Sequence, residues 1–319
     1  MTFSLAGALQ RGADRDLPAP VSAAVTTALD HLREGCFQRT LCLVVATTSV
    51  ASGLEVGYEH YKGSYSNPVM YTPVFLSGAL ALAGLSGALN RRAAATVLRW
   101  VSVITLADGV IGFFFHVRGV ARKPGGWKLP VTNIVMGPPI FAPLLFGTSA
   151  YLGLMASYLR REEDLHRPDL RIDSWLKGKR DSWKTELRHG RFQKHLSALT
   201  IAWAFFSGFE ALYSHYKTNF RYKAQWTPVL LTPLLMAAGA GALKSRFVAN
   251  TALPVVSALA LADGAIGFFC HARGVVRRPG GVKKPLYNTI YGPPVFAPLL
   301  FAACGFLGLM ASLLRRERE

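Results

Sequence analysis

The chain contains two copies of one sequence unit, separated by a constant offset of 155 residues. Gly137-Pro-Pro-Ile-Phe-Ala-Pro-Leu-Leu-Phe146 returns as Gly292-Pro-Pro-Val-Phe-Ala-Pro-Leu-Leu-Phe301. A period of this length predicts two copies of one structural unit. It also allows the two copies to be compared with each other, and the polar residues that both copies retain are few.

Hydrophobic residues make up 51% of the 319 residues and charged residues only 17%. A soluble protein of this size rarely combines these values. The first copy has four stretches almost free of charge, residues 41–57, 74–89, 101–115 and 140–159, and each returns in the second copy. About 20 apolar residues cross roughly 30 Å of hydrocarbon as a helix. We therefore expect an all-α integral membrane protein with eight transmembrane helices, built as two tandem four-helix bundles. The alternative is a soluble helical protein with unusually apolar core helices.

An even number of spans per copy gives both copies the same orientation, so they are parallel repeats. We expect a cytoplasmic N-terminal segment (1–35), a first four-helix repeat (36–160), a basic interfacial linker (161–195) and a second repeat (196–319). Lys and Arg are in excess on the side of the termini once the linker is counted, and no cleavable signal peptide is visible. Both termini are therefore predicted in the cytoplasm of a multi-pass inner (plasma) membrane protein.

The net charge of +18 lies mainly in loops beside the predicted spans. This placement favours anionic lipid head groups as partners and argues against nucleic acid. The four cysteines do not correspond between the copies and lack metal-ligand spacing, so we interpret them as small apolar residues. They are Cys36, Cys42, Cys270 and Cys304.

Two polar signatures are repeated. The first closes the first span of each copy and contains Glu55, Tyr58 and His60, matched by Glu210, Tyr213 and His215. The second runs through the third span and contains Asp108 and His116, matched by Asp263 and His271. Ionisable residues inside a membrane span are costly, so each is a functional hypothesis by default.

Helix geometry separates these groups into a histidine layer and a deeper carboxylate layer. Glu55 lies about 7–8 Å below His60, and Asp108 about 12 Å below His116, at 1.5 Å per residue. In an up-down-up-down bundle the first and third helices face each other diagonally. The pairs His60/His116 and His215/His271 are therefore predicted to hold b-type haem, one per copy, near the outer face. Gly53, Gly57, Gly109 and Gly112 would leave room for the flat ring.

The loop after each second histidine is basic. Its cations are predicted to pair with haem propionates. They are Arg118, Arg122, Lys123, Arg273, Arg277 and Arg278. The Pro-Gly-Gly turns in these loops predict a rigid cap over the end of each bundle. This cap would also suit an anionic head group. The turns lack the sequence features of a phosphate-binding loop.

Other interpretations use the same residues. The four histidines also suit non-haem iron, zinc, copper or manganese, with Glu59 as a bridging ligand. The acids Glu55, Asp108, Glu210 and Asp263 with Tyr58 and Tyr213 would also suit a proton or cation path in a transporter. A purely structural alternative has Glu55 hydrogen-bonded to Asp108, one of the two being protonated, and the histidines capping helix ends near water.

The function predicted from these residues is a membrane redox subunit. It would pass electrons from an outer-face redox partner to a lipid-soluble quinone, with the buried carboxylates handling coupled protons. The motifs leave open whether the protein is an enzyme, and the hydrolase motifs are absent. The small-residue stripes 153–157 and 308–312 predict contact between the bundles or a homo-oligomer.

Overall fold

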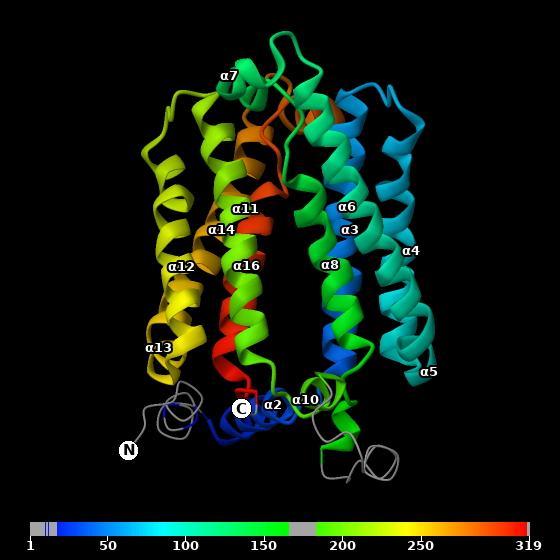
Figure 1. Cartoon of the computed structure of the whole chain (residues 1–319), viewed down its shortest axis with the longest axis vertical. Helices are drawn as coiled ribbons and strands as arrows, with labels where there is room; N and C mark the ends of the chain where they lie inside the picture. The colour runs from blue at the N-terminus through cyan, green and yellow to red at the C-terminus, as the bar shows by residue number, and fades with distance from the viewer. Residues whose placement is uncertain (1–9, 11, 13–17, 166–182, 318–319) are drawn as a thin grey trace.

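The computed structural model describes residues 10, 12, 18–165 and 183–317, and among these residues the helix is the regular element throughout (Figure 1). In the first half the helices are α2 (Ala19–Arg33), α3 (Gln38–Lys62), α4 (Thr72–Leu89), α5 (Arg91–Ala93), α6 (Arg99–Ala121), α7 (Pro130–Val135) and α8 (Ala142–Ala156). In the second half they are α10 (Trp183–Arg188), α11 (Gln193–Tyr216), α12 (Thr227–Lys244), α13 (Arg246–Asn250), α14 (Ala252–Val276), α15 (Pro285–Ile290) and α16 (Ala297–Leu313).

Six helical segments are long and apolar enough to cross a membrane. They are Gln38–Lys62, Pro68–Leu89, Arg91–Ala121, Gln193–Tyr216, Lys223–Lys244 and Arg246–Val276. The remaining two predicted spans correspond to the shorter apolar helices α8 and α16. The protein is therefore an all-helical protein of the multi-pass membrane type, with six helices of spanning length where the sequence predicted eight.

The long helices pack in the same order in both halves. α3 contacts α4, α4 contacts α6, α6 contacts α8, and α8 returns to α3; α11, α12, α14 and α16 repeat this pattern. α3 and α6 therefore lie diagonally, as do α11 and α14. Six of the eight fully buried leucines among the described residues also fall at equivalent positions. They are Leu41 and Leu196, Leu80 and Leu235, and Leu98 and Leu253.

The helices α8 and α16 are short because an irregular segment precedes each of them. Residues 137–141 lead from α7, at the top of Figure 1, down to the start of α8. Pro138 and Pro139 have no N–H and restrict the preceding backbone, so a helix cannot run through them. The 15 residues of α8 rise about 22 Å, less than the roughly 30 Å hydrocarbon core.

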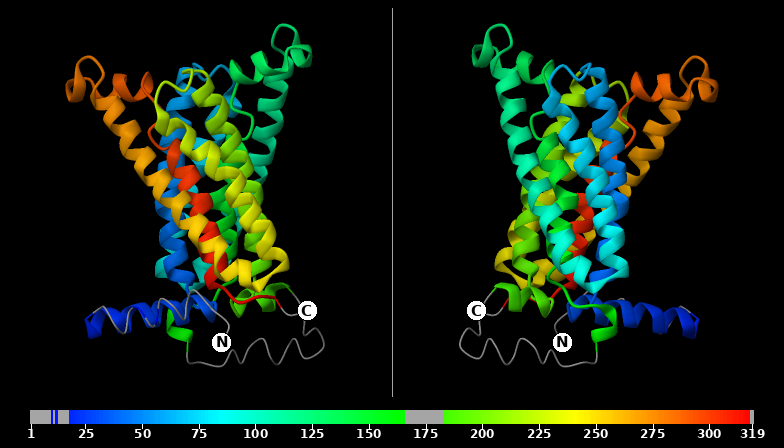
Figure 2. Two further views of the ribbon diagram at one scale, coloured as in Figure 1. Left: turned by 90° about the vertical axis from the view of Figure 1, so that its left-hand side faces the viewer. Right: turned by 90° about the vertical axis from the view of Figure 1, so that its right-hand side faces the viewer.

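At the other end of the molecule, α2 lies across the base of the long helices (Figure 2). Residues 166–182 of the predicted linker, including Trp175, Lys177, Lys179 and Arg180, lie outside the described residues. Its described part includes α10, where the Trp183 ring packs edge-on against Tyr158 at 5.0 Å.

An arginine and a glutamate follow the last helix of each half and bind helix ends nearby. Arg161 donates to the carbonyl oxygens of Gly87 (2.7 Å) and Ala88 (3.1 Å) at the end of α4. Glu162 accepts the backbone N–H groups of Arg39 and Thr40 at the start of α3. Arg316 and Glu317 make the equivalent contacts with α12 and α11. These residues satisfy terminal backbone groups that a helix leaves unpaired.

The glycines of the small-residue stripes pack within each half, where a contact between the bundles was one prediction. Gly153 lies against Ser102 of α6 and Val45 of α3. Gly308 lies against Ser257 of α14 and Thr200 of α11. In both cases the missing side chain lets helices of the same half approach closely.

Candidate functional site

The four repeated histidines lie near the ends of α3, α6, α11 and α14, at the end of the molecule that we call the histidine end. Each is partly buried. They are His60, His116, His215 and His271. The sequence predicted this common level because all four helices end on the same side.

Three of these histidines use the Nδ1 nitrogen for a backbone carbonyl. Nδ1 of His60 lies 2.6 Å from the Met70 oxygen. Nδ1 of His116 and of His271 each lie 2.5 Å from a proline oxygen, of Pro139 and Pro294 respectively. A carbonyl oxygen can only accept, so Nδ1 carries the proton and the Nε2 lone pair of a neutral ring is free. Metal-binding histidines are commonly oriented in this way.

In the second half the two histidines are direct neighbours. The ring centroids of His215 and His271 are 6.4 Å apart, with an interplanar angle of 87°. Metal–nitrogen bonds of about 2 Å would place two imidazole centroids about 6 Å apart across a metal ion. In the first half, the ring contact of His60 is with Tyr65, at 6.1 Å. The two copies of the predicted pair therefore differ in geometry.

A stacked aromatic pair lies beside the first histidine of each half. Tyr65 stacks on Tyr71 at 4.1 Å, and Phe220 stacks on Trp226 at 3.9 Å. Phe220 also contacts His215 at 6.2 Å. The sequence analysis missed these pairs. The available signal was an aromatic residue at both positions of both copies, five and eleven residues after the histidine.

The repeated glutamates cap the short helices of the opposite half. Glu55 of α3 accepts the backbone N–H of Phe296, which precedes α16, at 3.0 Å. Glu210 of α11 accepts the N–H of Phe141, which precedes α8, at 2.6 Å. Tyr213 donates its hydroxyl proton to Glu210. A helix N-terminus favours a carboxylate because its N–H groups are unpaired and its dipole is positive there. The alternative that Glu55 binds Asp108 is therefore wrong.

The repeated aspartates bind threonines instead. The Thr72 hydroxyl oxygen lies 2.6 Å from Asp108 Oδ1 and 2.9 Å from the Val69 carbonyl oxygen. The Thr72 hydroxyl donates toward both oxygens, as a single proton can in a three-centre hydrogen bond. A protonated Asp108 would instead donate to Thr72, and the Thr72 proton would then go to Val69 alone. Asp263 and Thr227 repeat this arrangement, at 2.5 Å.

The glycines beneath the histidines allow close helix packing, which corrects the prediction that they leave room for a ring. A methyl group on Gly53 would lie 2.7 Å from Cβ of Ser77 in α4. Methyl groups on Gly109 and Gly112 would meet Pro143 of α8, at 2.8 and 3.0 Å. Only Gly57 has open space beside it, with Tyr65 at 4.0 Å. Any large ligand of the histidines must therefore sit at their level or above it.

The predicted basic residues have no ion-pair partner within the part of the chain that the structure describes. Arg118, Arg122, Arg273 and Arg277 are exposed, and Lys123 and Arg278 are half-buried. The Nε of Arg278 is buried without a hydrogen-bond partner. Residues 109–161 and 264–315 contain no Asp or Glu at all. These cations therefore remain available to an anionic group.

Among the described residues, no three His, Cys, Asp or Glu side chains come together as a metal site. The proposed bridging residue Glu59 forms an ion pair with Lys62 at 2.9 Å. Zinc, manganese and non-haem iron usually take three or more protein ligands. The geometry therefore gives no support to the non-haem metal interpretation.

Fold and site together describe a multi-pass helical membrane protein with paired histidines at one end and carboxylate-capped short helices between its halves. Comparison of the chain with protein-family models, with curated proteins and with solved structures finds no match.

Proposed function

We propose that the protein is an electron-transfer subunit of the cell's inner membrane that binds b-type haem through its paired histidines. In this proposal α8 and α16 also cross the membrane, together with the irregular segments before them. They complete two tandem four-helix bundles with eight membrane-spanning segments in total. Both termini are cytoplasmic, and the histidine end faces outward.

The observation that carries the proposal is the neighbouring pair His215 and His271. Their centroid separation of 6.4 Å matches the spacing for a metal between two imidazoles. Among the described residues, no third His, Cys, Asp or Glu side chain joins this pair as a metal ligand. A metal held by two histidines needs its other positions filled by something else, and the four nitrogens of a haem macrocycle do this.

The unpaired cations support the same proposal. Haem carries two propionates, which suit guanidinium groups at a membrane surface. Arg273 follows His271 by two residues, and Arg278 has an unpartnered N–H. In the first half Arg118, Arg122 and Lys123 stand in the same relation to His116. The remaining basic loop residues are proposed to contact anionic lipid head groups.

The proposed electron route runs from a redox partner at the histidine end to quinone in the bilayer. Of the repeated acids, Asp108 and Asp263 are better suited than Glu55 and Glu210 to handle the accompanying protons. Protonated aspartates would donate to Thr72 and Thr227, whose own protons would then go to backbone carbonyl oxygens. The glutamates are instead engaged with helix N-termini.

A second candidate function is transport of a metal ion or small solute. The short helices α8 and α16 begin at a carboxylate between the two halves. Transporters often place broken helices and ionisable groups in such a position. Ion flux in proteoliposomes of colourless protein would favour this candidate.

The visible spectrum of the protein purified in mild detergent tests the proposal. We expect a Soret band that weakens in His271→Ala. The control is His195→Ala, which removes a histidine near the start of α11, at the far end of the molecule. A folded wild-type protein without a haem spectrum would contradict the proposal.

A further inference from the structure

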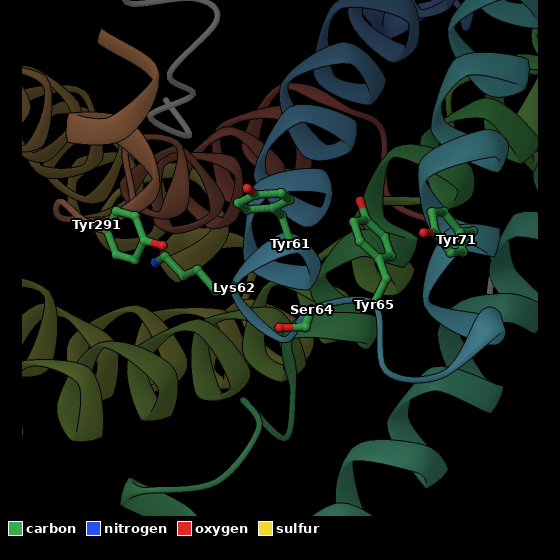
Figure 3. A pocket seen from close by; sticks show the side chains of 6 residues that line it. All are labelled: Tyr61, Lys62, Ser64, Tyr65, Tyr71 and Tyr291. Carbon is green, nitrogen blue, oxygen red and sulfur yellow. The ribbon is translucent and has the colours of Figure 1, made fainter. Parts of the chain in front are cut away.

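A pocket of about 350 Å³ opens at the histidine end (Figure 3). It is lined by residues at the end of α3, in the loop that follows, at η1 (Pro68–Tyr71) and after α15. They are Tyr61, Lys62, Ser64, Tyr65, Tyr71 and Tyr291. Tyr291 comes from the second half, so both halves contribute to the pocket.

The lining combines flat aromatic walls with hydrogen-bond donors. In Figure 3 the ends of Lys62 and Tyr291 point toward each other on one side of the pocket. Glu59 holds the Lys62 ammonium at 2.9 Å, which uses one of its three N–H groups. The Tyr65 hydroxyl donates to the Gly57 carbonyl oxygen at 2.9 Å. Lys62 and the Tyr291 hydroxyl therefore remain as donors for a ligand.

The pocket adjoins the histidine site of the first half. The Tyr65 ring stacks on Tyr71 and meets the His60 ring edge-on at 6.1 Å. Burial raises the pKa of Tyr65, and the neighbouring Tyr71 adds to this, so the phenol stays protonated. One aromatic ring thus separates the pocket from the imidazole of His60.

The second half has lost the features that form this pocket. Tyr65, Tyr71 and Ser64 correspond to Phe220, Trp226 and Asn219, and Tyr291 corresponds to Met136. Only Tyr216 and Lys217 match their counterparts Tyr61 and Lys62. The two copies have therefore diverged at this position, which separates its role from that of the repeated framework.

We propose that this pocket binds the head group of a quinone. The inference rests on the proposed electron-transfer function and names the place where its lipid-soluble partner binds. A planar ring would stack against the tyrosines, while Lys62 and Tyr291 donate hydrogen bonds to a carbonyl oxygen. A volume of about 350 Å³ lies within the range of small-molecule sites. Because the pocket lies at the histidine end of the membrane helices, an isoprenoid tail attached to the bound head group would extend into the lipid.

The test measures how tightly a short-chain ubiquinone analogue binds to the whole chain in detergent. Quenching of the intrinsic protein fluorescence reports the binding. The test variants are Lys62→Met and Tyr291→Phe. The matched controls are Lys217→Met and Met136→Leu at the equivalent positions of the second half. Losing one hydrogen bond of about 1 kcal/mol weakens binding about fivefold. We expect this loss in both test variants and unchanged affinity in both controls.

Equal affinities in all four variants, with melting temperatures like that of the wild type, would overturn the proposal. So would displacement of the quinone by phosphatidylglycerol with the same dependence on Lys62, because the pocket would then be an anionic-lipid site. The haem spectrum is recorded on the same samples. Variant-sensitive quinone binding without haem contradicts only the haem function, and haem without such binding contradicts only the pocket.

Discussion

Glu210 in the second half accepts a hydrogen bond from the backbone N–H of Phe141 in the first half, at 2.6 Å. Glu55 in the first half accepts the equivalent bond from Phe296 in the second half, at 3.0 Å. Each half thus supplies the cap for the short helix of the other. Irregular backbone inside a membrane protein is tolerated only where its polar groups find partners. Reciprocal capping meets this need and ties the halves together.

Removal of one cap is expected to destabilise the protein. Glu210→Ala leaves the Phe141 N–H and the Tyr213 hydroxyl without their acceptor. The loss of hydrogen bonds to a charged group costs about 2–3 kcal/mol. The measurement is the thermal unfolding midpoint in detergent.

A matched control for this variant is Glu163→Ala. Glu163 pairs with Arg39, and both side chains are nearly half exposed, at 47% and 48%. Exposed ion pairs contribute about 1 kcal/mol or less. A Glu210→Ala protein as stable as this control would show that the cap does not hold the halves together.

The proposed role of a protonated Asp108 as a proton carrier gives a second prediction. An asparagine can donate to Thr72 as a protonated carboxyl does, so Asp108→Asn is expected to keep the wild-type stability. Asp108→Ala should lose about 1 kcal/mol. The infrared carbonyl band of a protonated carboxyl should be present in the wild type and reduced in Asp108→Asn. An ionised Asp108 would give no such reduction.

Much of the helix arrangement could be predicted from the sequence, because charge-free stretches mark membrane helices. The stretch 74–89 became Thr72–Leu89, and 41–57 became part of Gln38–Lys62. The diagonal placement of α3 and α6 follows from the chain order. The common level of the histidines follows from helix direction.

The partners of the buried acids could not be predicted, because they depend on how the halves meet. Nothing near Glu55 in sequence indicates Phe296, which is 241 residues away. The starts of α8 and α16 depend on the paths of the irregular segments before them, residues 137–141 and 292–296. Gly53 and Gly109 illustrate a related limit, because a glycine pattern does not distinguish space for a ligand from close helix packing.

The arginines that end each half give a third prediction. Arg161→Ala removes two hydrogen bonds from the carbonyls of Gly87 and Ala88 and should lower stability by about 2 kcal/mol. Arg316→Ala should behave alike, because it removes the equivalent contacts with Ala242 and Leu243. The check is chemical unfolding of both variants. A marked difference between them would argue against equivalent roles.

The ion pair of Asp164 with Arg91, 2.9 Å long, predicts a pH dependence. Burial raises the pKa of Asp164, but the hydrogen bond and charge of Arg91 outweigh burial and hold the pKa below its usual range. A lowered folded-state pKa stabilises the fold above the unfolded pKa, and this contribution disappears as the pH falls through the folded pKa.

We therefore expect the melting temperature of the wild type to exceed that of Asp164→Asn at neutral pH. The difference should shrink in acid, as the pH falls below the usual aspartate pKa of about 3.9 and through the lowered folded-state pKa. The effect is small because the Arg91 side chain is 59% exposed and water screens the pair. A difference that stays constant with pH would show that the charge of Asp164 is not the cause.

The central claim is that paired imidazoles at the histidine end hold haem, and the haem content per chain tests it most directly. Pyridine haemochrome analysis of protein purified from its membrane should give one haem for each half. His271→Ala should lose the haem of the second half, the double variant His116→Ala/His271→Ala should lose both, and His195→Ala should lose neither. A folded wild-type chain that contains no haem, or haem that survives the double variant, would contradict the account.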